Sequence, residues 1–347
     1  MAQPSTTPSI STTGVAGTEN ERGAGMMSSE VKRRVAVSLS LLEEFLAASG
    51  DPVPGNPRLL ELAREGVATS ALGGKHLRSA LVHISAGEVT GQQLSAATAF
   101  GACVDLLHGS FLIHDDIIDR DDTRRGVPTI HALVRDEYGD PHLGTSIAIT
   151  AGDLGLNRAV QLLLDSSLDD AMLRSGLRIL TSAVEETITG EILDVAHSDG
   201  NVPDLELVRL SNHLKTSDYS FGAPLKLGAL AAGRDPAPMQ PIAFELGRAF
   251  QAADDIAGSV GDSSATGKST GGDIVHGRMT LMTMRLEDRS GADSAAVAGA
   301  VGDVVEEGQN HLNLARVLID ESDLDLGIRA GLHDMTNRIE GMLHAHS

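Results

Sequence analysis

Residues 108–131 hold the densest group of chemically active side chains in the sequence. Asp115, Asp116 and Asp119 follow an apolar run, and Arg124 and Arg125 come shortly after them. On a helix, Asp115 and Asp119 lie one turn apart on one face. Mg²⁺ binds through one or two carboxylates plus water and phosphate oxygens, and guanidinium groups bind phosphate. The spacing indicates a carboxylate, metal and phosphate site, although a solvated charged helix end has the same composition.

A second acidic pair, Asp254 and Asp255, follows another apolar helical run, 139 residues after Asp115. Carboxylates from two helices can face each other across the cavity of a helical bundle, and metal sites in bundles are built in that way. The alternative is that this pair only solvates the end of its helix. The pair therefore adds weight to the metal site only in combination with Asp115.

Basic residues occur at three further places. Lys75 and Arg78 are one turn apart at a predicted helix start after two glycines, which is a plausible anion site. Lys215 precedes Thr216 in a largely apolar helix, where a lysine needs solvent or an anionic partner. A Gly-rich stretch, residues 265–280, reads as a flexible lid that carries Lys268. His108 fits either a core position or a phosphate donor.

The elements that must position these groups are predicted to be helices. Aromatic residues make up only 2% of the chain and Trp is absent, so the core consists of Leu, Ala, Val, Ile and Met, which suits packed helices. Apolar residues recur at spacings of three and four, and no alternating strand pattern is found. After a tail predicted to be disordered, residues 1–28, we expect a single all-α domain over residues 29–347. The helical ranges begin at residue 29 and continue over 59–71, 75–87, 92–119, 143–165, 169–197, 205–232, 241–260, 280–286, 292–319 and 324–344.

Charge and cysteine content exclude several classes of protein. The net charge of −21 disfavours nucleic acid binding, which depends on basic surface. The single cysteine, Cys103, excludes an internal disulfide framework and a Cys-rich zinc site. With no signal-peptide core and no uninterrupted apolar run of membrane-spanning length, we expect a cytoplasmic protein without stable membrane insertion.

Taken in order, the motifs resemble those of the trans-prenyltransferases, the polyprenyl (isoprenyl) diphosphate synthases, over about residues 35–345. They are G-K-x-L-R from Gly74, H-x5-H-D-D-x2-D-x4-R-R from His108, F-Q-x2-D-D from Phe250 and G-K-x3-G-D-I from Gly267. The last two look most like bacterial geranylgeranyl diphosphate synthases. The resemblance implies a large helical bundle with a central cavity. It also implies a homodimer that condenses isopentenyl diphosphate head to tail with an allylic diphosphate, using three Mg²⁺.

The resemblance also assigns roles to individual residues. Two Mg²⁺ on the allylic diphosphate would be held by Asp115, Asp116 and Asp119, and the third by Asp254 with Asp255 nearby. Isopentenyl diphosphate would be bound by Lys75, Arg78, His108 and Arg125. The allylic diphosphate would be bound by Arg124, Lys215 and Lys268. Gln251 would line the same region, and Thr216 would lie beside the reacting carbons.

Product length is expected to depend on Ser110 and Phe111, five and four residues before Asp115. Family enzymes that stop at C15 usually carry a bulky aromatic residue at the first position. Here that residue is Ser, which leaves the floor open, and Phe111 closes it in part. The expected product is C20, geranylgeranyl diphosphate, with C15 next, and Ser110→Tyr or Ser110→Phe is expected to shorten it.

The sequence departs from the family pattern in a few places. Gly258 stands where many members have a third Asp, Glu191 stands where Gln is common, and the C-terminus lacks the basic tail of some members. Four alternatives stay open. They are a farnesyl diphosphate synthase, a class I terpene synthase on the same fold, a non-catalytic regulatory subunit, and a metal-binding His114-Asp115 pair of the HD phosphohydrolase type. A cyclase needs no second diphosphate pocket, and a regulatory subunit is expected to lose the acidic or basic residues that this chain keeps.

Overall fold

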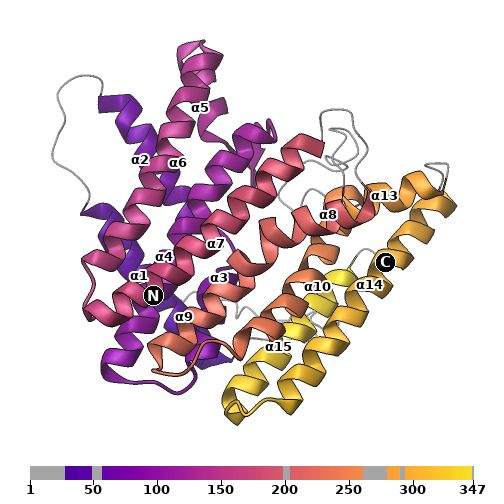
Figure 1. Cartoon of the computed structure of the whole chain (residues 1–347). Helices are drawn as coiled ribbons and strands as arrows, with labels where there is room; N and C mark the ends of the chain where they lie inside the picture. Colours follow the sequence, from indigo (N-terminus) through magenta and orange to yellow (C-terminus); the bar gives the residue numbers. More distant parts are fainter. Residues whose placement is uncertain (1–27, 49–56, 198–203, 261–279, 290–293, 346–347) are drawn as a thin grey trace, which may run out of the picture.

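The structure is a computed structural model that describes residues 28–48, 57–197, 204–260, 280–289 and 294–345. The expected N-terminal tail lies almost wholly outside these ranges. The expected lid, with Lys268, also lies outside them except for its last residue, Thr280. Helices make up most of the described chain, which confirms the all-α fold class (Figure 1).

The long helices agree with the predicted ranges to within two or three residues at most ends. In chain order the helices are α1 (Ser29–Ala47), α2 (Pro57–Leu72), α3 (Leu77–Ala86), α4 (Gly91–Ile118), α5 (Ile130–Tyr138), α6 (Pro141–Leu164), α7 (Asp170–His197), α8 (Leu205–Asn212), η2 (His213–Gly222), α9 (Ala223–Ala231), α10 (Met239–Val260), α13 (Leu281–Asp288), α14 (Ser294–Glu321) and α15 (Leu326–Leu343). The sequence did not predict α5. It also did not predict the antiparallel pair β1 (Thr123–Arg124) and β2 (Val127–Pro128), in which Thr123 lies opposite Pro128.

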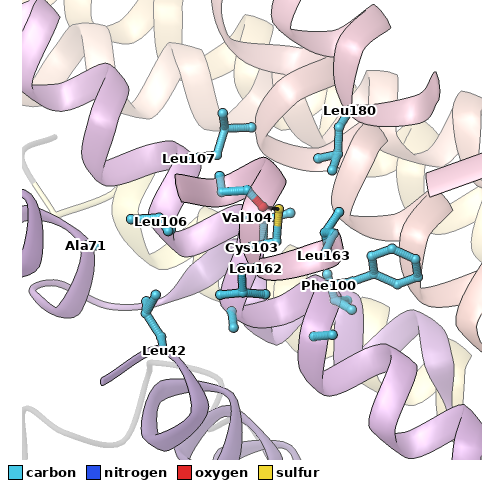
Figure 2. Packing of buried hydrophobic residues seen from close by; sticks show 14 of the residues in the cluster. Leu42, Ala71, Phe100, Cys103, Val104, Leu106, Leu107, Leu162, Leu163 and Leu180 are labelled. Atoms are coloured by element: carbon cyan, nitrogen blue, oxygen red, sulfur yellow. Dashed lines mark hydrogen bonds between the residues drawn. The ribbon is translucent and has the colours of Figure 1, made fainter. Parts of the chain in front are cut away.

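Helix α4 is the centre of the N-terminal half and packs against α1, α2, α3, α6 and α9. Figure 2 shows its residues Phe100, Cys103 and Leu106 in one hydrophobic cluster with Leu163 of α6 and Leu180 of α7. By length and composition α4 is apolar enough to cross a membrane, but 78% of its most apolar window is buried inside the protein. A core helix therefore accounts for its hydrophobicity.

A second core joins the C-terminal helices α10, α13, α14 and α15 to α3. Leu81 and Ile84 on α3 contribute to this second core, whereas Val82 and Ala86 on the same helix belong to the first. Helix α3 therefore connects the two halves. The site residues near its N-terminus, including Arg78, are held between both cores.

The predicted helix over residues 205–232 is divided into α8, the π-helix η2 and α9. A π-helix bonds i to i+5 and is therefore wider than an α-helix, so its neighbours must leave room. Gly190 of α7 and Gly247 of α10 provide that room. A Cβ at Gly190 would stand 2.3 Å from the backbone nitrogen of Lys215, and one at Gly247 would stand 2.6 Å from Cβ of Ser217. Two glycines on flanking helices thus accommodate the wide turns that carry Lys215 and Thr216.

Candidate active site

A cavity of about 1440 Å³ lies at the junction of α3, α4, α7, η2, α10 and α15. One stripe of α4 forms its longest wall through Asp105, His108, Phe111, Asp115 and Asp119. These residues are three or four positions apart, so they share one helical face. Spacing that is visible in the sequence therefore places the first acidic cluster and His108 along a single wall.

The three aspartates of the first cluster do not share one environment. Asp115 and Asp119 line the cavity, whereas Asp116 does not line it and is buried. Burial raises the pKa of Asp116 to about 6, although the neighbouring Arg124 acts in the opposite direction. Nε of Arg124 donates a hydrogen bond to Asp116. Asp116 therefore anchors an arginine rather than facing the cavity.

The second acidic pair also divides into two roles. Asp254 is exposed and lines the cavity from α10. Asp255 is buried at 2% exposure, and it accepts hydrogen bonds from Nε2 of Gln251 at 2.6 Å, the backbone nitrogen of Leu281 at 2.9 Å and Nδ2 of Asn212 at 3.3 Å. Asp255 therefore ties α13 and α8 to α10, and Gln251 faces this carboxylate as well as the cavity.

Two cations neutralise the acidic wall. Arg124 donates from one terminal nitrogen to Oδ2 of Asp115 at 2.8 Å. Nζ of Lys215 lies 2.7 Å from Glu191, 3.0 Å from Asp194 and 3.7 Å from Asp115. Burial disfavours the charged ammonium, but the carboxylates outweigh it and hold the pKa of Lys215 well above its ordinary value. Lys215 therefore has the anionic partners that its apolar helix required.

A second group of cations also lines the cavity. Lys75, Arg78 and Arg125 all line it, and none of the three forms an ion pair within the described ranges. Arg125 lies directly against two glycines, because a Cβ at either Gly73 or Gly74 would stand 2.7 Å from its guanidinium. Positive charge that lacks a protein counterion inside a cavity indicates an anionic ligand.

Aromatic and polar contacts orient this basic group. Arg78 stacks over the ring of Tyr219 at 4.6 Å and donates to Oγ of Ser220 at 2.7 Å. His108 lies in the same wall. Burial, together with the charges of Arg78, Arg125 and Arg124, holds the pKa of His108 well below its ordinary value. The ring is therefore neutral and offers one N–H donor.

Several cavity residues were not singled out from the sequence, among them Tyr219, Asp105 and Arg338. Tyr219 was hidden because a π-helix shifts which residues of 213–222 share a face. Asp105 reads as a polar residue in a core helix, yet it is buried, and its Oδ2 lies 2.9 Å from Nδ1 of His76. Arg338 of α15 lines the cavity from the C-terminal half, and no motif marks it. An isolated residue 84 positions after Asp254 carries no local signal.

The residues expected to limit product length point in different directions. Phe111 lines the cavity and meets Tyr219 edge to face, with ring centroids 5.0 Å apart. Ser110 is fully buried, donates to the carbonyl of Leu106 at 2.9 Å and faces Gly155 of α6, so it is not part of the cavity lining. Below Phe111, Leu107 and Cys103 are packed in the core (Figure 2).

Comparison with known proteins identifies the family of the chain. The family model for polyprenyl synthetase matches residues 61–311. A short chain isoprenyl diphosphate synthase of Methanothermobacter thermautotrophicus is 32% identical over 67% of this chain and 69% of its own length. A geranylgeranyl diphosphate synthase of Mycobacterium tuberculosis is 31% identical over 75% of each chain.

Solved structures show the same fold. The geranylgeranyl pyrophosphate synthase of Corynebacterium glutamicum, solved with isoprenyl diphosphate and magnesium, superposes with a TM-score of 0.79 at 27% identity. The match covers 89% of this chain and 99% of that one. The family match over residues 61–311 and the structural match over 89% of the chain agree with each other. The chain therefore belongs to the polyprenyl synthetase family and is a prenyltransferase.

Proposed function

We propose that this enzyme condenses isopentenyl diphosphate with an allylic diphosphate and that its main product is geranylgeranyl diphosphate. The observation that carries the proposal is that one cavity is lined by two kinds of charged group. Asp115, Asp119 and Asp254 provide carboxylates that suit a metal-bound diphosphate. Lys75 and Arg78 provide cations that have no ion pair within the described residues and suit a second diphosphate.

The acidic side fits Mg²⁺. Within the described residues, no three His, Cys, Asp or Glu side chains converge as a ready metal cage. Mg²⁺ suits such an arrangement because it usually keeps several waters and takes one or two carboxylates plus phosphate oxygens. Asp115 and Asp119 would hold it from α4 and Asp254 from α10. When bound, Mg²⁺ stabilises negative charge on the departing pyrophosphate.

The protein side chains contribute positioning and charge. Arg124 and Lys215 lie against the acidic wall, where they can also bind the allylic diphosphate and stabilise the leaving group. Lys75, Arg78 and Arg125, together with neutral His108, hold isopentenyl diphosphate so that its double bond meets the allylic carbon. Thr216 lines the cavity beside Lys215, and the proton lost at the end can leave with pyrophosphate.

The proposal of a C20 product is based on the shape of the cavity, because the names of the relatives do not agree on one chain length. They include farnesyl, geranylgeranyl and geranylfarnesyl diphosphate synthases. In this chain Phe111 is the large side chain that meets the descending product, and the space beneath it is filled by Leu107. A partly closed floor favours a product of intermediate length, and C15 is the nearest alternative.

We also propose a homodimer. Helix α6 exposes Ile149, Val160 and Leu164, which are 45%, 40% and 57% accessible. Exposed large apolar side chains on one helix indicate a surface that another chain covers. The cytoplasmic location expected from the sequence stays a prediction.

The proposed reaction is tested by incubating the purified protein with Mg²⁺, isopentenyl diphosphate and one allylic primer at a time, namely dimethylallyl, geranyl or farnesyl diphosphate. We expect a C20 diphosphate from each primer and no elongation after chelation with EDTA. A C15 end product would correct the length alone. A cyclic hydrocarbon would identify a terpene synthase, and no product from any primer would refute the proposal.

A further inference from the structure

Arg338 is a cation in the cavity wall that the roles above leave unused. It is half-buried on α15, and within the described part of the chain it has no hydrogen bond or ion pair. Burial lowers its pKa. By contrast, Arg316 of the neighbouring helix α14 is paired with Glu340 at 2.8 Å. A half-buried guanidinium without a protein partner is unfavourable unless an anion arrives to pair with it.

The face of α15 that carries Arg338 is turned toward the cavity. Met335, Ile339 and Met342 also line the cavity, at spacings of three and four from Arg338 or from one another. Side chains at such spacings share one face of a helix. Arg338 is the only charged residue among the α15 residues that line the cavity. It is therefore presented to the cavity by an otherwise apolar stripe.

The packing of α15 on α3 shows which end of the cavity Arg338 reaches. A Cβ at Gly87 would stand 3.1 Å from Ile328, and a Cβ at Gly331 would stand 2.8 Å from Ile84. Ile84 lies three residues before Gly87, whereas its neighbour Gly331 lies three residues after Ile328. The two helices therefore run antiparallel. Continuing that register by seven residues on each helix places residue 338 level with Leu77, the first residue of α3.

We propose that Arg338 binds the diphosphate of isopentenyl diphosphate, approaching it from α15 while Lys75 and Arg78 approach from the start of α3. This inference rests on the proposed function. Arg124 and Lys215 serve the other diphosphate and are already paired with the acidic wall. Arg338, like Arg78, has no such pairing in the described chain. A guanidinium binds phosphate oxygens with two parallel hydrogen bonds, which gives both affinity and orientation.

The test compares wild type with Arg338→Met and Arg338→Lys in steady-state kinetics, varying one substrate while the other is saturating. For Arg338→Met we expect the KM for isopentenyl diphosphate to rise about tenfold, the loss typical of a charged hydrogen bond. The KM for the allylic primer and the Tm should stay at their wild-type values. Arg338→Lys should recover part of the affinity, since it keeps the charge but not the two-pronged geometry.

Arg329→Met is the matched control, because it removes an arginine from the same helix at a position outside the cavity lining. It should leave both KM values unchanged. An active wild type with an unchanged isopentenyl diphosphate KM in Arg338→Met would overturn the inference while leaving the proposed function intact. A rise in the allylic KM instead would also overturn it. A wild type inactive with every primer would refute the proposed function, and this inference with it.

Discussion

One terminal nitrogen of Arg124 lies 2.8 Å from Oδ2 of Asp115, and the same guanidinium also binds Asp116. A single arginine thus neutralises two adjacent aspartates, of which only Asp115 lines the cavity. Nζ of Lys215 lies 3.7 Å from the other carboxylate oxygen of Asp115, Oδ1. The acidic wall is therefore compensated by the protein itself, and a metal-bound diphosphate must compete with these contacts. The measured affinity for the metal-bound diphosphate will therefore reflect the difference between its own contacts and the contacts that Arg124 and Lys215 already make with the aspartates.

Substitutions of Asp254 and Asp255 are expected to affect different properties, activity in the first case and stability in the second. Asp254→Asn should lower kcat/KM by about 100-fold or more, through weaker binding of the metal on which charge stabilisation depends, with an unchanged Tm. Asp255→Ala removes the acceptor of three hydrogen bonds and should destabilise the fold by about 3 kcal/mol. Thermal unfolding and initial rates at several Mg²⁺ concentrations separate the two. An equal loss of Tm in both variants would contradict these separate roles of Asp254 and Asp255.

Gly73→Ala is expected to displace Arg125. The new methyl group would stand 2.7 Å from its guanidinium and 2.8 Å from the carbonyl of Thr69, so the arginine must move. The KM for isopentenyl diphosphate should rise about tenfold, while that for the allylic primer stays unchanged. Gly302→Ala is the matched control, because a Cβ there meets nothing within 4 Å and should be neutral or slightly stabilising. Unchanged kinetics in Gly73→Ala would remove Arg125 from this role.

Phe111 and Ser110 are expected to give different phenotypes. Phe111→Ala opens the cavity wall and should shift the product distribution toward chains longer than C20, measured by chromatography of the hydrolysed products. Ser110→Phe places a ring against Gly155, where a Cβ alone would already stand 2.1 Å from Oγ of Ser110. We expect it to separate α4 from α6 and cost about 1–3 kcal/mol of stability. A stable Ser110→Phe enzyme with a shorter product would restore the role predicted from the sequence.

His83 should make the fold sensitive to acid. It is 1% exposed, and burial lowers its pKa from 6.5 to about 4. The unfolded chain therefore binds a proton that the folded chain excludes between these values, so stability falls as pH drops from about 6.5 to 4. The shift corresponds to about 3 kcal/mol.

The measurement for His83 is denaturant unfolding of wild type and His83→Gln between pH 7 and 4.5. Gln does not titrate and can still meet the hydroxyl of Ser38, which lies 2.9 Å from the ring. Wild type should lose more free energy of unfolding than the variant over this window, since all other titrating groups are common to both. Parallel pH profiles would show that His83 does not set the dependence.

The helices and the acidic and basic motifs could be predicted because they depend on local spacing. The stripe from His108 to Asp119 follows directly from helical geometry. The different roles of Asp115 and Asp116 could not be predicted. Consecutive residues on a helix are rotated by about 100°, so the two side chains must face different neighbours. That rotation does not determine which of the two faces the cavity. That outcome depends on Arg124, whose placement is set by a hairpin of two-residue strands.

Other features escaped prediction because they arise from contacts between distant segments. Arg338 reaches the cavity only because α15 packs on α3 with one particular register. Ser110 was correctly predicted to lie on the same helix as Asp115, but the direction of its side chain depends on the close approach of α6 at Gly155. Helix α5 is nine residues long and lies next to a hairpin, so its periodicity is short. Long-range packing decides such cases.

The π-helix makes the active site sensitive to the number of residues in the chain as well as to their identity. Each turn of η2 holds about one residue more than an α-helical turn. Deleting a single residue between 213 and 222 lets the segment relax toward an α-helix and rotates Lys215 and Thr216 relative to Tyr219. The residues of η2 that pack closely against Gly190 and Gly247 are then displaced from these glycines as well. Substitutions here alter one side chain, whereas an insertion or deletion alters the direction of them all.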